Sequence, residues 1–415
     1  MNQPGLLARG LVTRQARLRA LVVAMTLGLG CAPGLGNCAE PSFRAVTIDG
    51  NTTTGRLASL RDGRLVIEGP GGRKTEIPWK RLVILERDTP APVPSPDREQ
   101  IALPDGDWLA QIALGTTTDA SLEVQSDPLG KLTLPIECVV GAILSPPAQS
   151  TEFEALRTRL AAEPRASEIV WLKNGDSLTG GFLGLNEQKL RLRVAGKSMD
   201  LDRAGVVAVG FDPSLAAYPV AAIDGELVLR DGSRLGVTGP SLDDGSIKAT
   251  TRFGQIIKVG LGEVIRLRAR TPAVVFLTDR KPERTDYVSY IGPTRPFRAD
   301  RTVDGQPLRL AGQFHDRGLG TQSRTFLVYR IEPGDLRFQA LVGVDERAGP
   351  LASVAFRVLV DRREGFHSNP LSEHDAPKSI DVDLTGGKYL ILITEFGERG
   401  DVRDLADWVE ARIIR

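Results

Sequence analysis

Few residues in this sequence have the types and spacing that catalysis requires. The three histidines, His315, His367 and His374, all lie in the last third of the chain, and none stands in a Gly-x-Ser-x-Gly or His-Glu-x-x-His setting. Many acidic residues precede glycine, as in Asp62-Gly63, where turn formation is their ordinary role. Two carboxylates at the correct separation could hydrolyse a glycosidic bond. Hydrolysis of glycosides therefore stays open as one hypothesis for the function, beside the two that are given at the end of this subsection.

Thiol and metal chemistry are limited by the supply of ligands. Of the three cysteines, Cys31 and Cys38 lie in the first 39 residues, and Cys138 is alone in the rest of the chain. A Cys/His metal site or an internal disulfide after Ala39 would need more cysteines than this one. Cys138 stands in the apolar run 134–144, so we expect it to be a buried small side chain.

The last third of the chain has the pattern of β-strands. From residue 286 on, short segments of alternating apolar and polar residues are separated by Gly, Asp, Asn and Pro, which is typical of an antiparallel β-sandwich. Alternate residues from Val354 to Val360 should face its core. The runs 380–384 and 389–393, joined through Gly386-Gly387, are predicted to form a hairpin.

Several blocks of this region resemble, in the same order, the NPCBM family of carbohydrate-binding modules, which is found attached to glycoside hydrolases and to bacterial envelope proteins. The resemblance covers about the last 130 residues. The blocks are Tyr287 to Tyr290 (YVSY), Gly318-Leu319-Gly320 with Ser323, Phe338 to Asp345 (FQALVGVD), Val354 to Asp361 (VAFRVLVD), residues 382–384 (VDL) and Asp404 to Ile413 (DLADWVEARI).

The resemblance implies a galactose-binding-like jelly-roll sandwich that holds sugars in loops at one end and catalyses no reaction. Two positions differ from the family pattern. Thr321-Gln322 stands where a His usually follows the Gly-Leu-Gly block, and Asp404-Leu405 stands where Asp-His usually precedes Ala-Asp-Trp. The resemblance does not name the sugar.

Sugar contacts should come from loops, because a sandwich presents its strand ends to ligands. A sugar needs a flat apolar face and planar donors or acceptors for its hydroxyl groups. Residues 315–317, 361–377 and 396–404 offer both. The predicted carbohydrate-binding residues are His315, Arg317, Arg363, Phe366, His367, Glu398, Arg399, Asp401 and Arg403.

Two features near the C-terminus have structural interpretations. Trp408 lies in an apolar run and matches a family position that we expect to be core. Glu410 matches a position where galactose-binding-like folds often bind a structural calcium, and Asp345 is a second candidate oxygen ligand.

Residues 40–272 are predicted to hold four diverged copies of one unit. Each copy has an Asp-Gly or Asn-Gly pair, and 26 to 28 residues after that glycine an apolar run opens at Ile77, Leu134, Leu201 or Val259. Units of about 45 residues with short strands form small SH3-like or strongly bent sheets. The predicted division is a signal peptide (1–39), repeats at 40–88, 99–147, 168–213 and 214–272, a Pro-rich linker (89–98), a helical linker (148–167) and the sandwich (273–415).

The helical linker contains the one convincing helix, residues 151–163. Thr151 and Glu154 are spaced as a capping box, and Pro164 should end the helix. Its narrow apolar stripe, Phe153, Leu156 and Leu160, should pack against a neighbouring unit.

The first 39 residues have the pattern of a signal peptide. Arginines precede the apolar run 20–29, and a cleavage point is predicted between Ala39 and Glu40. We expect export to the periplasm, the cell surface or the medium, with lipidation at Cys31 as a variant, and no transmembrane anchor after cleavage. A net charge of +1 over 415 residues gives no reason to expect a nucleic-acid partner.

The predicted fold class is all-β: a jelly-roll sandwich preceded by four small β repeats, with one connector helix. The favoured function is non-catalytic binding of a glycan or glycoconjugate, with the repeats as spacer or docking units and no cofactor beyond structural calcium. The alternative is a structural or assembly protein of the cell envelope whose sandwich binds protein instead of sugar.

Overall fold

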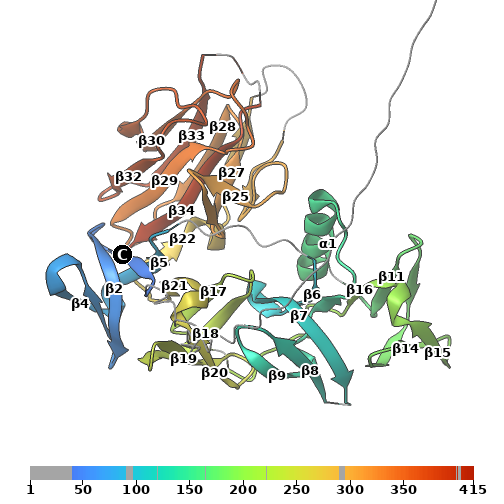
Figure 1. Ribbon diagram of the computed structural model, residues 1–415. Helices are drawn as coiled ribbons and strands as arrows, with labels where there is room; N and C mark the ends of the chain where they lie inside the picture. Colours follow the sequence, from blue (N-terminus) through green and yellow to red (C-terminus); the bar gives the residue numbers. More distant parts are fainter. Residues whose placement is uncertain are drawn as a thin grey trace, which may run out of the picture. The chain divides into compact units, whose positions relative to one another are not determined.

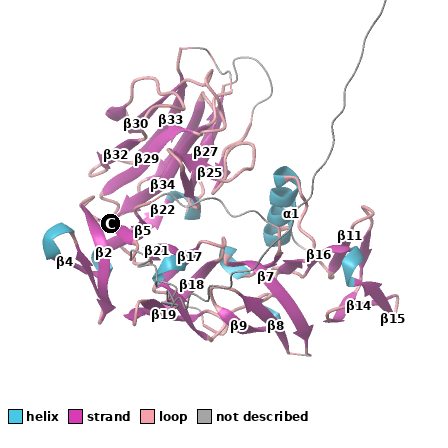
Figure 2. Cartoon of the chain, viewed as in Figure 1, coloured by secondary structure: helices cyan, strands magenta, loops and turns pink. Residues whose placement is uncertain are grey.

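The computed structural model describes residues 40–89, 97–118, 120–163, 165–220, 222–288, 295–398, 400 and 403–415. In this part of the chain strands predominate and one α-helix occurs, which confirms the all-β fold class (Figures 1 and 2). Residues 40–415 form one compact unit. The predicted signal peptide with Cys31, and residues 90–96 of the Pro-rich linker, lie outside the described residues.

The C-terminal region is a sandwich of two antiparallel sheets (Figure 1). The β34 sheet has the order β24-β27-β34-β29-β32, with β22 also paired to β34, and the β33 sheet has the order β23-β28-β33-β30-β31. Two further strands, β25 and β26, pair only with each other. The strands are β22 Val274–Phe276, β23 Arg284–Tyr287, β24 Arg298–Ala299, β25 Leu308–Leu310, β26 Gln313–His315, β27 Gly318–Thr321, β28 Thr325–Arg330, β29 Arg337–Val344, β30 Val354–Val360, β31 Arg363–His367, β32 Lys378–Asp383, β33 Tyr389–Phe396 and β34 Ala406–Ile414.

The core between the two sheets is centred on Trp408. Its ring is fully buried and meets Phe356 edge to face, with centroids 5.2 Å apart. The indole Nε1 donates a hydrogen bond to Thr394 Oγ1 at 3.0 Å, as a buried Trp requires. The predicted burial of Trp408 and of alternate residues along Val354–Val360 is confirmed.

The predicted hairpin at 380–393 is wrong. β32 pairs with β29 in one sheet, whereas β33 pairs with β28 and β30 in the other, so residues 384–388 cross between the sheets. Gly386 does adopt the positive φ, 77°, that the turn requires. A hairpin within one sheet and a crossing between two sheets both need such glycines. In either arrangement each strand turns one side toward the core. The sequence pattern could not separate them.

Twenty-one strands precede the sandwich, and they fall into four successive groups. In the first group β1 pairs with β2 and β5, β2 with β3, and β3 with β4. The second and fourth groups repeat this order. The strands are β1 Ser42–Thr47, β2 Thr52–Arg61, β3 Arg64–Glu68, β4 Lys74–Pro78, β5 Leu82–Arg87; β6 Glu99–Ala102, β7 Trp108–Thr117, β8 Ser121–Ser126, β9 Gly130–Pro135, β10 Gly141–Ile143; β11 Ile169–Leu172, β12 Ser177–Thr179, β13 Gly181–Leu185, β14 Lys189–Val194, β15 Lys197–Asp202, β16 Val206–Gly210; and β17 Gly225–Leu229, β18 Arg234–Asp243, β19 Ser246–Thr251, β20 Ile256–Gly260, β21 Val264–Ala269.

The third group differs because β13, β14 and β15 form a separate sheet while β11 pairs with β12 and β16. Each group has a single turn of 3-10 helix before its last strand. These turns follow the apolar runs on which the repeat prediction rests. The predicted domain boundaries remain a prediction.

The groups join through their last strands. β5 pairs with β21, opposing Leu85 and Leu267, and β10 pairs with β16, opposing Ala142 and Val209. The first group is thereby joined to the fourth and the second to the third. A contact of β18 with β7 links these two pairs.

Helix α1, Ser150–Ala162, connects the second and third groups. Phe153, Leu156 and Leu160 are buried against Trp108 and Ile143, as the apolar stripe predicted. The capping box is wrong, because the N-cap is Gln149 and no side chain caps the helix. Glu154 forms an ion pair with Arg301 at 2.8 Å instead. Pro164 lies outside the described residues.

Cys138 is fully buried, which confirms its predicted role as a small core side chain. Its Sγ donates to the carbonyl of Ala217 at 3.2 Å. Burial raises the pKa of this thiol to about 11, so it stays protonated at neutral pH.

Gly318 and Gly320 of β27 stand where other segments come close. A Cβ on Gly320 would lie 2.2 Å from the carbonyl oxygen of Arg301 and 2.4 Å from the Cα of Thr302. These are backbone atoms, so the clash could not be relieved by a side-chain movement. The Gly-Leu-Gly block is therefore a packing requirement of the sandwich.

We predict that Gly320→Ala lowers the free energy of unfolding by about 2–3 kcal/mol or more, because the added methyl group must displace backbone. Gly262→Ala is the control, since nothing lies within 4 Å of its Cβ position, and its effect should stay within about 0.5 kcal/mol. Urea unfolding of both variants measures the difference. Equal stability of the two would contradict the close approach at Gly320.

Candidate functional site

The predicted site residues do not form one site. His315, Arg317, Glu410 and Asp345 are buried. His367, Glu398 and Arg403 are exposed at the end of the sandwich where β33 ends and β34 begins, which we call the loop end. Arg399 and Asp401 lie outside the described residues.

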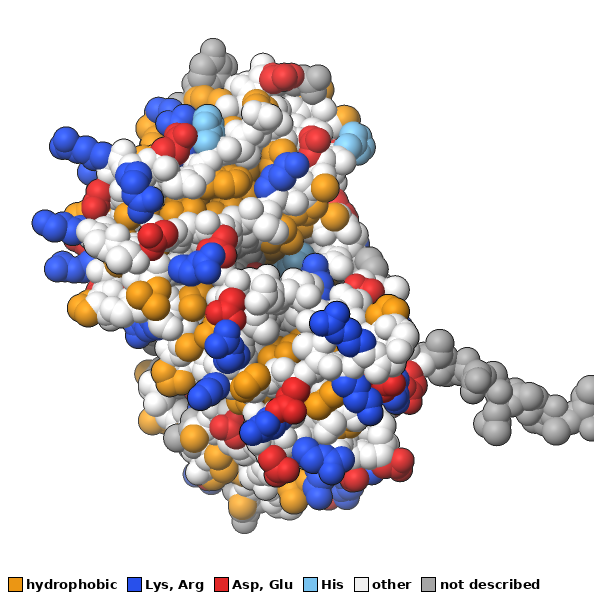
Figure 3. Space-filling view, turned by 90° about the vertical axis from the view of Figure 1, so that its left-hand side faces the viewer, with side chains coloured by type: hydrophobic (Ala, Val, Ile, Leu, Met, Phe, Trp, Pro, Cys, Tyr) orange, Lys and Arg blue, Asp and Glu red, His pale blue; other side chains and the backbone are white. Residues whose placement is uncertain are grey.

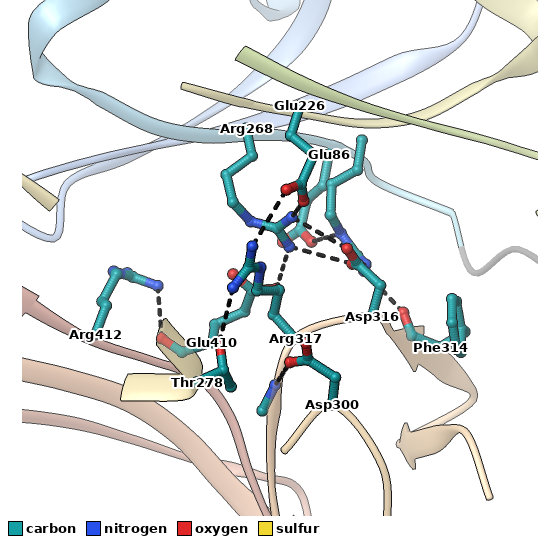
Figure 4. Close-up of polar contacts among 12 residues, drawn as sticks. Glu86, Glu226, Arg268, Thr278, Asp300, Phe314, Asp316, Arg317, Glu410 and Arg412 are labelled. Carbon is teal, nitrogen blue, oxygen red and sulfur yellow. Dashed lines mark hydrogen bonds and ion pairs between the residues drawn. The ribbon is translucent and has the colours of Figure 1, made fainter. Parts of the chain in front are cut away.

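Arg317 and Glu410 lie in a buried network of ion pairs between the β repeats and the sandwich (Figure 4). Asp316 follows β26 directly. Its carboxylate accepts hydrogen bonds from Nη1 and Nη2 of Arg268, each at 3.1 Å, and also pairs with Arg266. Arg268 reaches Glu410 at 2.8 Å and also pairs with Glu226. This two-pronged contact of Arg268 with Asp316 is the strong geometry for an arginine and a carboxylate.

Arg317 extends the network on the side of the sandwich. Its Nη2 lies 3.3 Å from Glu226 and its Nη1 donates to Thr278 Oγ1 at 2.8 Å, with a further pair to Asp279. Phe276 packs beneath it, with its ring centroid 5.4 Å from the guanidinium carbon. Arg317 is thus committed to structure and offers no donor at the surface.

Strand geometry places these side chains. Arg266 and Arg268 alternate with the aliphatic residues Ile265 and Leu267 along β21. The side chains of both arginines therefore project from the same face of the strand. That face meets the β26–β27 connection of the sandwich. The alternation of arginine with apolar residues along this strand is the sequence signal for the interface, which was not among the predictions from the sequence.

The pKa values in the network follow from burial and pairing. Burial alone would raise the pKa of Asp316, but Arg268 and Arg266 hold it well below its ordinary value. Burial likewise opposes ionisation of Glu226, and Arg234 and Arg268 outweigh it, so its pKa is also lowered. Both carboxylates remain charged at all ordinary pH values.

His315 lies beside this network and stays neutral at neutral pH. Burial and the nearby Arg266 lower its pKa to about 3. Neither ring nitrogen has a hydrogen-bond partner among the described residues. A buried neutral imidazole of this kind is not available to a ligand, so the predicted sugar contact of His315 is wrong.

Glu410 and Asp345 do not fit a calcium site. Glu410 pairs with Arg268, and Asp345 accepts four hydrogen bonds from Arg309 and Arg347. Among the described residues no group of three or more His, Cys, Asp or Glu could hold a metal ion. Arginines already supply the positive charge that calcium would bring to these two carboxylates.

At the two sites that differ from the family pattern, Thr321, Asp404 and Leu405 are buried and Gln322 is half-buried. Thr321 hydrogen-bonds Thr394 at 2.8 Å and the carbonyl of Ala406 at 3.1 Å. Asp404 accepts from the backbone N–H of Ser353 at 3.1 Å and from the hydroxyl of Ser323. The side chains of Thr321 and Asp404 thus stabilise the loop end through buried hydrogen bonds.

A row of side chains crosses the outer face of the β33 sheet at the loop end. Across the strands β28, β33, β30 and β31, Phe326 lies opposite Ile393, Ile393 opposite Arg357, and Arg357 opposite His367. Directly opposed residues share one face of a sheet. Glu395 completes the row, because it accepts from Arg357 at 3.1 Å and lies 3.8 Å from His367 Nε2.

Arg324 adds a second charge beside this row. Its guanidinium carbon lies 5.2 Å from the centroid of the Phe326 ring and 5.8 Å from that of Phe396, within the range of a cation–π contact. We call Arg324, Phe326, Arg357, His367 and Glu395 the loop-end surface. Of these, His367 alone was predicted from the sequence, because it falls in the predicted loop 361–377 and the other four lie outside the predicted loops.

The remaining predicted residues lie around or away from this surface. Phe366 is half-buried and packs against the sandwich core. Glu398 and Arg403 are anchored by the hydrogen bonds Glu398 N to Ser353 Oγ (3.1 Å) and Arg403 Nη2 to the carbonyl of Arg347 (3.3 Å). Arg363 stands at the opposite end of β31 and donates to the carbonyl of Asp383. In Figure 3 hydrophobic side chains reach the surface of the sandwich, the upper half of that view, among Lys and Arg side chains.

Residues 274–414 match the NPCBM/NEW2 domain. The last third of the chain is therefore an NPCBM domain, the family that its sequence blocks resemble. It belongs to a class of non-catalytic carbohydrate-binding modules.

One curated relative is a protein of Renibacterium salmoninarum named "Putative endo-alpha-N-acetylgalactosaminidase". The two sequences are 25% identical over 235 residues, which make up 53% of this chain and 15% of the relative. This chain thus spans about 15% of the length of that protein.

The solved structures that are similar include CBM51 from Clostridium perfringens GH95 in complex with methyl-galactose. It is 24% identical with a TM-score of 0.31, and the match covers 34% of this chain and 99% of that one. The tandem CBM51 modules of Sp3GH98 from Streptococcus pneumoniae SP3-BS71 are 12% identical with a TM-score of 0.31, covering 59% of this chain and 87% of theirs.

We predict that Asp316→Asn destabilises the protein by about 3–5 kcal/mol, because it leaves Arg266 and Arg268 buried without their shared carboxylate. Urea unfolding measures the change. Asp127→Asn, which removes an exposed pair with Arg98, should have little effect. A loss no larger than that of the control would show that the network does not hold the sandwich in place.

His315 should make stability depend on pH in a defined window. Because its pKa is about 3 in the folded protein and about 6.5 in the unfolded chain, the unfolded chain binds the extra proton between these values. Stability then falls as pH decreases, by about 1.4 kcal/mol per unit below pH 6.5.

Between pH 6.5 and pH 5, the free energy of unfolding of His315→Leu should therefore fall by about 2 kcal/mol less than that of the wild type. Thermal or urea unfolding at both pH values measures the difference. His374→Leu, in which an exposed histidine is replaced, is the control and should follow the wild-type curve. Parallel curves for His315→Leu and the wild type would contradict the neutral buried state.

Proposed function

We propose that this protein binds glycans without catalysis, through the loop-end surface of its NPCBM domain. The observation that carries the proposal is the NPCBM match over residues 274–414. The loop-end surface supports it, because that surface combines an aromatic ring with planar charged groups on one face of the sandwich.

The chemistry of the surface suits a sugar. The half-exposed ring of Phe326 offers an apolar face for the C–H groups of a pyranose. Glu395 can accept hydrogen bonds from hydroxyl groups, and Arg357 holds that carboxylate at 3.1 Å. The guanidinium of Arg357 presents further donors in a fixed plane, and His367 adds an exposed ring.

The four strand groups serve as a rigid base for the sandwich in this proposal. Their pairing through β5–β21 and β10–β16 supports a docking role more than that of an extended spacer. We further propose that the protein is exported, as its N-terminal sequence predicts. None of the helices among the described residues has the length and hydropathy of a membrane span.

A glycan array probed with residues 40–415 tests the proposal. We expect binding to one class of glycan, weakened about 10-fold by Phe326→Ala and by His367→Ala, since each substitution removes one stacking or hydrogen-bonding contact. Arg363→Ala is the matched control, because Arg363 lies at the other end of β31, and it should leave binding unchanged.

Two results would overturn the proposal. Absence of glycan binding, with a purified envelope protein bound by the same surface, would favour the structural or assembly role. Release of reducing sugar from a polysaccharide would show that the chain is a hydrolase.

A further inference from the structure

An open hollow of about 570 Å³ lies where the second and third strand groups join through β10 and β16. Its walls come mainly from the segment 136–139 of the second group and from the segments 166–168, 181–183 and 211–216 of the third. We call it the joint hollow. Its volume is within the range of ligand sites, and no residue of the loop-end surface lines it.

The first and fourth groups join in the same way, and there the corresponding place is filled by a tryptophan. Their 3-10 turn begins with Trp79, two residues after the apolar run opens at Ile77. The indole Nε1 donates to the carbonyl of Asp224 at 3.2 Å. A Cβ added to Gly225 would lie 3.2 Å from the ring carbon Cζ2. The first strand of the fourth group thus begins against an aromatic ring of the first group.

The joint of the second and third groups lacks this aromatic ring. Ile136 begins the corresponding turn, two residues after Leu134. By the register of the first strands, Glu168 stands where the fourth group has Gly225. An isoleucine side chain is smaller than an indole, so the place that Trp79 fills at one joint is left open at the other.

The inner surface of the joint hollow is apolar. Phe182 and Phe211 meet edge to face with their ring centroids 5.2 Å apart, and both pack against the core of the repeats. Leu183 and Leu215 also line the hollow, and they are 39% and 78% exposed. Apolar side chains that gather at an exposed hollow indicate a binding surface.

The rim of the joint hollow is acidic. Glu137, Glu168 and Asp212 line it, and its described lining includes no Lys or Arg. Neither glutamate has an ion-pair partner in the part of the chain that the structure describes. Asp212 accepts hydrogen bonds from the backbone N–H and the hydroxyl of Ser214, at 2.9 and 2.8 Å. Arg165 forms no ion pair with Asp212 and donates to backbone carbonyls instead. The rim therefore favours a cationic partner.

We propose that the joint hollow docks a cationic segment of a partner protein, with an aromatic side chain in the hollow and Lys or Arg side chains at its rim. Such a segment supplies at this joint the ring that Trp79 supplies at the other. An acidic segment would be repelled by the three carboxylates. The inference rests on the docking role proposed for the strand groups and names its partner, whereas it does not depend on glycan binding at the loop-end surface.

Selection from a random peptide library displayed on phage, with residues 40–415 as bait, tests the proposal. We expect the enriched peptides to carry Trp, Phe or Tyr flanked by Lys or Arg. Calorimetry with one synthetic peptide from the selection then compares variants. Glu168→Lys should weaken its binding at least 10-fold, because the substitution reverses a charge at the rim. Glu283→Lys is the matched control, since Glu283 is an exposed residue outside the hollow, and it should bind as the wild type does.

Two variants test the hollow itself. Ile136→Trp introduces the side chain that fills the other joint, so peptide binding should be lost while the unfolding midpoint does not fall. Leu215→Ser changes a side chain that is 78% exposed, so folding should be unaffected while the peptide binds several-fold more weakly. Phe326→Ala should leave peptide binding unchanged, and Ile136→Trp should leave glycan binding unchanged. These two results separate failure of this site from failure of the loop-end surface.

Three results would overturn the proposal. The first is a selection that enriches no peptides, or peptides without aromatic and basic residues. The second is undiminished peptide binding by folded Ile136→Trp and Leu215→Ser. The third is a wild-type dimer in sedimentation that Ile136→Trp dissociates, which would assign the joint hollow to a second copy of this chain.

Discussion

The contact of Asp316 with Arg266 and Arg268 is the constraint on which the arrangement of this protein depends. All three side chains are nearly removed from solvent, and a charge in that position is tolerated only when a partner neutralises it. The arginines belong to β21 of the last repeat and the carboxylate to the sandwich. Asp316 thus joins the sandwich to the repeats through buried charges that neutralise one another. The NPCBM domain of this chain is built to be held by its repeats.

This constraint also decides where a ligand can bind. The β26–β27 connection and part of the β34 sheet are occupied by the interface, which removes His315, Arg317 and Glu410 from contact with solvent. The outer face of the β33 sheet and the loop end remain accessible.

The sequence was informative where one residue pattern has one structural meaning. Alternation along Val354–Val360, the apolar setting of Trp408 and the isolation of Cys138 all led to correct burial. It was misleading at 380–393, where glycines that permit a tight turn also permit a crossing between sheets. The capping box failed because Glu154 is attracted to Arg301, which lies 147 residues away along the chain.

The candidate site was harder to predict than the fold for a related reason. A loop histidine beside Asp and Arg has the same sequence whether solvent or another domain covers it, so His315 and Arg317 were placed at the surface. Phe326 and Arg357 alternate within strands and look like ordinary members of a sheet. Their grouping depends on the register of four strands that are distant in sequence, and a single sequence does not contain that register.

The pairing of β5 with β21 has a consequence for how the chain is made. Leu85 meets Leu267 across this ladder, so the first group of strands keeps an open edge until some 180 further residues have been synthesised. An open edge can recruit any other extended segment, and a ladder between such distant segments forms slowly. The nascent chain would thus pass through an aggregation-prone interval, and a chaperone that shields β5 during that interval would improve the yield of folded protein.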